Sequence, residues 1–250
     1  MTMSTKPWMT WNGKAGRWLI LTAVSVLTIP ILAATDPAGS KSRSEEWEAF
    51  RKANGLKWSV GWDHLLGTPR VLDGGRTEPI PGTPEEAARR FLARYSSLFG
   101  MTHDLRDLKT LRIQESPGGT HVYFDQSFRG LPVFKGGVDV HLTERNEVHL
   151  VYNRYVPEEI LADLVLEPRL TPEEASALAK REYSHHVFRG FDGKPIKAGI
   201  PFEVLQGREL GIARWNDEYR LAHRIVVGDV RYTLDATSGE ILDTTELVLF

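Results

Sequence analysis

Hydrophobic residues recur with the period of a helix in two segments that open with the same five residues. Thr83–Ala87 and Thr171–Ala175 both read TPEEA and start 88 residues apart. In each copy the threonine is suited to cap the helix, the proline fits the first helical position, and the second glutamate completes a capping box. Apolar positions then follow at helical spacing. The pattern predicts helices over 83–99 and 172–183, each packed on a sheet.

Between these helices, apolar and polar residues alternate with the period of a strand. The alternation predicts strands at 56–62, 121–128 and 131–142, with turns at 67–69, 73–75 and 129–130. Gly136-Gly137 indicates a bulge in the last of these strands. The loop Glu144–Asn146, with Asn146 in the left-handed conformation, predicts a hairpin. Its register sets Leu142 opposite Val148, Val140 opposite Leu150 and His141 opposite His149.

The second helix is also followed by strand patterns. We expect strands at 202–205, 210–213, 219–227, 230–234 and 240–249, with Gly228-Asp229 as a two-residue hairpin turn. Asp235–Gly239 reads as a tight turn in which the Asp235 carboxylate accepts backbone N–H groups and Gly239 takes a positive φ. The chain is therefore expected to be an α+β protein built from two modules, each a helix on an antiparallel sheet.

The N-terminal segment has the features of an export signal. Lys6, Lys14 and Arg17 are followed by an uncharged apolar stretch from Trp18 to Thr35, and Ala33-Ala34 offers small residues for cleavage. We expect residues 1–34 to be a signal peptide; the alternative is an anchor that is retained in the membrane. Residues 35–55 form a lead with a short helix over 45–54, capped by Ser44 and ended by Gly55.

Composition and motifs exclude several functions. The formal net charge of −2 and the lack of a strongly basic region argue against a nucleic-acid partner. With no cysteine, the chain has neither disulfides nor thiolate metal ligands. The printed sequence also lacks His-Glu-x-x-His, a phosphate-binding loop and Gly-x-Ser-x-Gly. We therefore expect neither catalysis nor a cofactor.

Two stretches resemble known modules. Thr120–Phe134, THVYFDQSFRGLPVF, is similar to the core signature of the FTP domain, the N-terminal part of the propeptide of fungalysin- and thermolysin-type zinc metallopeptidases. Its pattern is a hydrophobic strand, then Gln126, Phe128, Gly130, Pro132 and Val133. Arg220–His223 and Tyr232–Leu242, with Asp235 and Gly239 in the turn, resemble a PepSY domain. The two resemblances together span about residues 56–245.

The resemblance implies cystatin-like folds, with an FTP-like domain over 56–160 and a PepSY-like domain over 165–250. Such modules assist folding of the peptidase that follows them and inhibit it until they are removed. For this chain it implies an exported, secreted or periplasmic protein without catalysis. Its partner is then a zinc metallopeptidase catalytic domain, bound in trans. The chain would contact a membrane only through its N-terminal segment, if that segment is not cleaved.

Two alternatives stay open. A family precursor would continue beyond Phe250 into its catalytic domain, so the chain can be an orphaned or truncated pro-region. It can also be an envelope interaction module without a peptidase partner.

The candidate site residues are structural or partner-binding. Gln126 falls on the apolar side of its strand, and we expect its amide to satisfy backbone groups at the Gly130–Pro132 bend. The apolar end, Leu247–Phe250, is a candidate for a last strand or for a peptidase cleft, with Leu249 and Phe250 as contacts. His141 and His149 are expected to be a polar cross-strand pair and not a metal site, because zinc needs further ligands. The full set is Gln126, Phe128, Gly130, Pro132, Val133, Asp235, Gly239, Leu249 and Phe250.

Overall fold

A computed structural model describes residues 40–186, 188–189, 195–196 and 205–247. The predicted signal segment lies outside this part of the chain, and so do the terminal residues Leu249 and Phe250. Of the strand predicted at 202–205, only the last residue is described. Residues 36–250 group as one compact unit. Among the described residues, no helix has the length and apolar character to cross a membrane.

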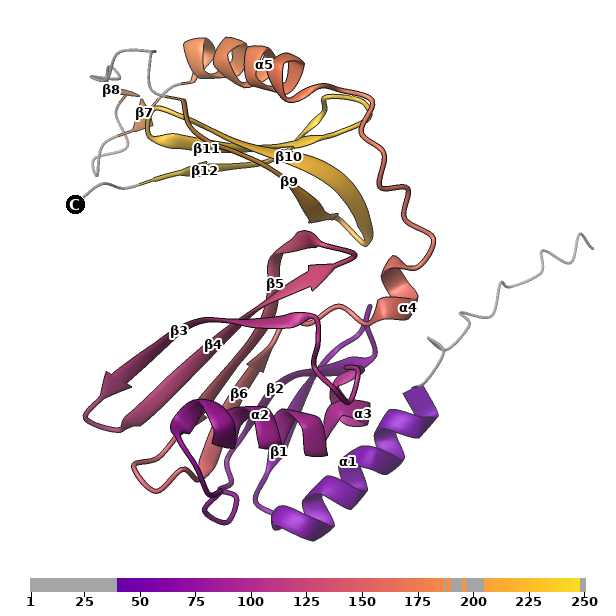
Figure 1. The fold of residues 1–250 in the computed structure, drawn as a ribbon, viewed down its shortest axis with the longest axis vertical. Coiled ribbons are helices and arrows are strands. Elements are labelled where there is room, and N and C mark those ends of the chain that lie inside the picture. The colour runs from indigo at the N-terminus through magenta and orange to yellow at the C-terminus, as the bar shows by residue number, and fades with distance from the viewer. Residues whose placement is uncertain (1–39, 187, 190–194, 197–204, 248–250) are drawn as a thin grey trace, which may run out of the picture. The chain divides into compact units, whose positions relative to one another are not determined.

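The chain combines a few helices with a large, mostly antiparallel sheet, which confirms the α+β class (Figure 1). The helices are α1 (Ser40–Asn54), α2 (Pro84–Arg94), α3 (Ser96–Phe99), α4 (Glu158–Leu161) and α5 (Pro172–His185). The strands up to α4 are β1 (Ser59–Asp63), β2 (Thr68–Asp73), β3 (Leu108–Ser116), β4 (Gly119–Phe128), β5 (Leu131–Leu142) and β6 (Val148–Asn153). Those after α5 are β7 (Phe188–Arg189), β8 (Pro195–Ile196), β9 (Leu205–Trp215), β10 (Glu218–Val227), β11 (Val230–Asp235) and β12 (Ile241–Glu246).

Both predicted helix starts are confirmed with the same hydrogen bonds. Thr83 Oγ1 accepts from the backbone N–H of Glu86 at 3.3 Å, and the Glu86 carboxylate accepts from the N–H of Thr83 at 2.8 Å. Thr171 and Glu174 repeat the arrangement at 3.2 and 2.8 Å. These capping boxes satisfy backbone donors that have no partner inside the helix.

The main sheet has the strand order β1-β2-β6-β5-β9-β10-β11-β12, with β4 also on β5 and β3 on β4. Its pairings are antiparallel except where Val133 of β5 meets Ile212 of β9 in parallel. Helix α2 packs on β4 and β5, and α5 packs on β10 and β11 (Figure 1). The predicted layering of a helix on an antiparallel sheet therefore occurs twice.

In the part of the chain that the structure describes, buried side chains form four clusters. The largest lies within residues 47–155 and includes Phe91, Phe124 and Val140, each no more than 1% exposed. A second lies within residues 175–234, under α5. The other two combine residues from both stretches: one includes Phe128, Val133 and Ile212, and the other includes Phe134 and Ala213.

Several predicted boundaries are wrong. The strand expected from Leu56 begins at Ser59, and Leu56 is 74% exposed. The turn expected at 67–69 ends at Gly67, because Thr68 and Pro69 begin β2. Ser44 lies inside α1, so it does not cap this helix. Gly55 does end α1, with φ of 102°. The helix predicted over 83–99 is interrupted at Tyr95 and continues as α3, which ends at Gly100 with φ of 68°.

The predicted register of the β5–β6 hairpin is only partly right. Leu142 pairs with Val148 as expected, and Asn146 has φ of 57°. The register then shifts by one residue, so Val140 pairs with Val151 and His141 with Leu150. The predicted pairs of Val140 with Leu150 and of His141 with His149 are therefore wrong, because a bulge beside the turn takes up one residue of β6.

Candidate binding site

Gln126 connects β4 to the chain segment that follows β6. Its side chain is 2% exposed and lies on the same face as Val122, Phe124 and Phe128, as predicted. The amide N–H donates to the carbonyl of Val156 at 2.7 Å, and the amide oxygen accepts from the Val156 N–H at 2.8 Å. The expected bonds to the bend at 130–132 are wrong. One buried side chain instead satisfies both backbone groups of Val156.

Opposite Gln126, strand β5 bulges away from β4. The pairing passes from Asp125–Gly137 directly to Ser127–Pro132, so residues 133–136 stand out of the ladder. Lys135 has φ of 63° and Gly137 has φ of 125°. A Cβ atom at Gly137 would collide with the backbone carbonyl of Phe124, which explains the glycine. The predicted bulge at Gly136-Gly137 is confirmed. It brings Val133 and Phe134 against β9 and Lys135 to Asp243 of β12.

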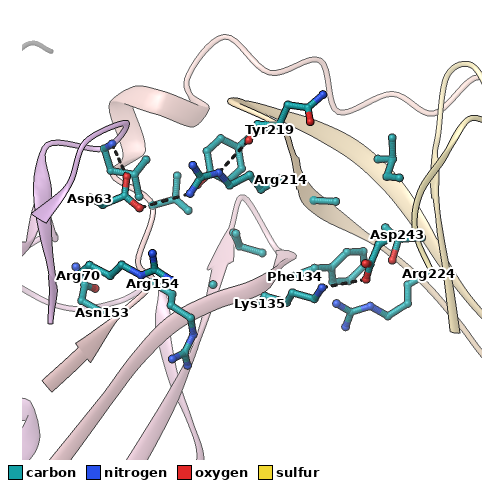
Figure 2. A pocket seen from close by; sticks show the side chains of 18 residues that line it. Asp63, Arg70, Phe134, Lys135, Asn153, Arg154, Arg214, Tyr219, Arg224 and Asp243 are labelled. Carbon is teal, nitrogen blue, oxygen red and sulfur yellow. Dashed lines mark hydrogen bonds and ion pairs between the residues drawn. The ribbon is translucent and has the colours of Figure 1, made fainter. Parts of the chain in front are cut away.

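The bulge forms part of the wall of a cleft of about 410 Å³ (Figure 2). Its apolar wall includes Val133, Phe134, Val156 and Leu242, all buried. The cationic side chains that line it are Arg70, Lys135, Arg154, Arg214 and Arg224, and the acidic ones are Asp63 and Asp243. The cleft thus combines an apolar wall with more cationic than acidic side chains. A volume of this size fits the common range of ligand pockets, about 300–1,000 Å³.

Four of these five cations have carboxylate partners. Arg154 donates two hydrogen bonds to Asp139, at 2.8 and 2.9 Å, and this interaction raises the pKa of Arg154. Lys135 contacts Asp243 at 2.9 Å, and Arg214 contacts Asp63 at 3.4 Å. Arg214 and Tyr219 lie beside Asp63 in Figure 2, and burial raises the pKa of the Tyr219 phenol.

Arg224 lies in an unusual setting at the other end of the cleft. Its guanidinium carbon is 3.6 Å from the centre of the Phe134 ring, a close cation–π contact. The carboxylate of Glu209 is 3.6 Å away. Its Nε is buried and has no hydrogen-bond partner among the described residues. Burial and then the charge of Arg231 lower the pKa of Arg224. The neighbouring carboxylates therefore do not fully offset the desolvation of its cationic form.

Two histidines meet on the face of the sheet opposite α2. The Nδ1 atoms of His121 and His141 are 2.5 Å apart, across the β4–β5 pair. Burial, the neighbouring His121 and also His149 lower the pKa of His141 to about 4, against a small opposing effect of Asp139. Within the described ranges, no group of three or more His, Cys, Asp or Glu side chains is arranged to hold a metal ion.

Asp235 and Gly239 form the predicted turn. The Asp235 carboxylate accepts from the N–H groups of Thr237 and Ser238 at 2.7 and 2.9 Å, and Gly239 has φ of 77°. Burial pushes the pKa of Asp235 up, but these amide hydrogen bonds and Arg220 outweigh it and lower the pKa. The Asp235 side chain thus stabilises the turn by binding backbone N–H groups of the same turn.

The predicted residues fall into two groups. Phe128 and Val133 share a buried cluster with Val156, the partner of Gln126. Gly130 is exposed in the β4–β5 turn, and Pro132 is the second residue of β5. Asp235 and Gly239 lie on the separate β11–β12 turn. The charged lining of the cleft was missed, because Asp63, Arg70, Arg154 and Arg214 are far apart in the chain. One sequence signal could have indicated the cleft: Arg224 is a cation between buried positions of β10.

Comparison with known proteins finds similarity in part of this geometry. Residues 107–155, which span β3 to β6, match the profile of the Fungalysin/Thermolysin Propeptide Motif. Thermolysins of Alicyclobacillus acidocaldarius subsp. acidocaldarius, Bacillus caldolyticus and Bacillus sp. (strain EA1) are each 22% identical to the chain over 204 residues. The aligned region covers 76% of this chain and 35% of each relative.

A solved structure, the Bacillus megaterium YpeB C-terminal domain, aligns with a TM-score of 0.40 and 11% identity, over 84% of this chain and 97% of that domain. The chain spans about a third of the length of the thermolysins it matches. The stretch from β3 to β6 thus carries a propeptide motif. A propeptide motif is not a catalytic domain.

Proposed function

We propose that this chain is an exported, non-catalytic, propeptide-like protein that binds a thermolysin-like zinc metallopeptidase domain and inhibits it or assists its folding. The observation that carries the proposal is the propeptide motif over residues 107–155, supported by the similarity to thermolysins. We assign the FTP-like, cystatin-like module to 56–160 and a PepSY-like module to 165–250, after a signal segment at 1–34 and a lead at 35–55.

The edge strand β3 suits the docking of such a partner. In the described part of the chain β3 pairs with β4 alone, so its outer backbone N–H and C=O groups are open. Leu111 is 60% exposed and Ile113 47% exposed on this strand. An open edge with apolar side chains can accept an extended segment as an added strand. We assign the first contact with the peptidase to this edge, with Leu249 and Phe250 as further proposed contacts.

Binding of this kind accounts for both expected effects. A protein that binds the folded peptidase and not the unfolded chain stabilises the folded state by mass action, by about 2.7 kcal/mol at a concentration of 100 Kd. The same complex inhibits the peptidase if it covers the substrate cleft. Neither effect needs a bond-breaking group on this chain.

A refolding assay tests the proposal. A denatured thermolysin-like catalytic domain is diluted with and without the purified chain, and recovered proteolysis is measured before and after the chain is removed. We expect a higher recovered yield, and inhibition while the chain is present. Ile113→Lys should weaken both effects about tenfold, because it places a charge in the apolar edge.

Gln114→Lys is the matched control, since it adds the same charge at the next residue of β3, where the side chain is already exposed and polar. No change in yield and no inhibition by the unmodified chain would reject the proposed function. Equal effects of the two variants would reject the β3 edge as the docking surface and leave the function itself supported.

A further inference from the structure

The cleft beside the β5 bulge has features of a ligand site that differ from those of an open strand edge. Four of its five cations gather at two ends, as Figure 2 shows: Arg70 and Arg154 lie near Asn153, and Arg224 and Lys135 lie near Phe134. The buried side chains of Val133, Val156 and Leu242 contribute apolar wall. A ligand that fits must carry negative charge and also an apolar part.

Two of the arginines keep guanidinium N–H groups without a hydrogen-bond partner among the described residues. Arg70 is exposed and takes part in none of the ion pairs formed among the described residues. Arg224 has a buried Nε without a partner in the same part of the chain, and its Glu209 contact is long at 3.6 Å. A buried charged donor without an acceptor is costly, so an anion at this point would stabilise the site.

The charge distribution favours carboxylates over polyanions. Asp63 and Asp243 also line the cleft, and they would repel a ligand with dense negative charge such as a nucleic acid. Arginine binds a carboxylate with two parallel hydrogen bonds. The Phe134 ring lies against the Arg224 guanidinium, whose Nη1 is 3.6 Å from Glu209 and whose Nε has no partner among the described residues. Single carboxylates attached to an apolar chain fit both the wall and the charges.

We propose that this cleft binds an extended peptide segment in which two acidic side chains flank apolar ones. One carboxylate contacts Arg70, and the other contacts Arg224. In an extended chain each residue advances about 3.3 Å, so acidic residues three positions apart can reach separate arginines. This inference goes beyond the proposed function, because it concerns the cleft and holds whether or not β3 binds a peptidase.

Calorimetric titration of the full chain tests the inference with the peptide acetyl-Glu-Leu-Val-Glu-amide. We expect saturable binding that disappears with the glutamine analogue acetyl-Gln-Leu-Val-Gln-amide. Arg70→Gln should weaken binding about tenfold, since a hydrogen bond to a charged group is lost. Arg70 is exposed, so this variant should fold, which circular dichroism checks; Arg224→Gln then tests the buried end.

Arg145→Gln is the control, because it removes the same charge from an exposed hairpin tip outside the cleft and should bind the peptide normally. Decanoate, a fatty acid, tests whether the cleft instead binds a carboxylate on a hydrocarbon chain. Decanoate binding without peptide binding would overturn the peptide assignment, and equal binding of the glutamine analogue would overturn the role of the carboxylates. Unchanged affinity in folded Arg70→Gln would overturn the role assigned to that end of the cleft.

Discussion

Helices α2 and α5 begin identically but are buried in different ways. Position by position, at the 88-residue offset, Phe91 of α2 corresponds to Ala179 of α5, and Leu92 corresponds to Lys180. Phe91 and Leu92 are both fully enclosed, whereas Lys180 is exposed and Ala179 lies close against the sheet. The aromatic rings of Phe50 and Phe99 surround Phe91 on α2.

The difference shows that the start of a helix and its burial are encoded separately. The capping box depends on four consecutive residues and therefore looks the same twice. The width of the buried stripe depends on how many elements cover the helix. Helix α2 packs on the sheet and also meets α1, through Phe91 and Phe50, so it buries large side chains on two sides. Among the described residues, α5 packs on β10 and β11.

Truncation of Phe91 should give the largest difference between the two helices. Phe91→Ala leaves a cavity among Phe50, Phe99 and Tyr95, and we expect a loss of about 3–5 kcal/mol in the free energy of unfolding. The corresponding change in α5, Ala179→Gly, should cost only about 1 kcal/mol. Urea unfolding of both variants measures the contrast. Similar losses would show that the two helices contribute equally to burial, against our interpretation.

The histidine pair should make the β4–β5 part of the sheet sensitive to acid. His141 binds a proton at about 6.5 when unfolded and at about 4 when folded, so the unfolded state holds more protons between these values. Stability should therefore fall as the pH falls through this window, and after allowance for partial exposure we expect a loss of about 1–2 kcal/mol.

Unfolding at about pH 7 and about pH 5 checks this sign, with His141→Gln expected to flatten the dependence. His185→Gln is the control, because His185 is exposed at the end of α5. A steeper loss in His141→Gln than in the unmodified chain would contradict the assignment.

The smallest effects should come from the caps, and there the two helices should agree. Thr83→Ala and Thr171→Ala each remove one capping hydrogen bond, with an expected cost of about 1 kcal/mol in both cases. Thermal unfolding of the two variants measures the costs. A cost several times greater for one helix would mean that the cap also takes part in tertiary packing, which the shared geometry does not indicate.

Local signals predicted the parts of the fold that depend on neighbouring residues. The caps, the turn at Asp235, the left-handed Asn146 and the burial of Gln126 on the face of Phe124 all follow from spacing within a few residues. Strand β3 was missed because its residues from Lys109 to Glu115 are mostly exposed and show no alternation. The partner of Gln126 was missed because Val156 is 30 residues away.

The cleft was beyond prediction for the same reason. Its charges come from β1, β2, β5, β9, β10 and β12 and from Arg154, which follows β6. Long-range contacts such as the pairing of Val133 with Ile212 bring them together. No short segment of the sequence contains more than two of its charged residues. Single-residue bulges such as the one beside His149 also shift the register in a way that alternation alone does not reveal.

The segment between α4 and α5 is attached at both ends and exposed in its middle. Val156 is bonded to Gln126 and Leu161 is buried, while the N–H groups of Arg169 and Leu170 both donate to the carbonyl of Ala236 at 2.9 Å. Val165, between these attachments, is 72% exposed. A cut in the chain there would leave each new end fastened, so the two fragments should remain together as a noncovalent, nicked molecule.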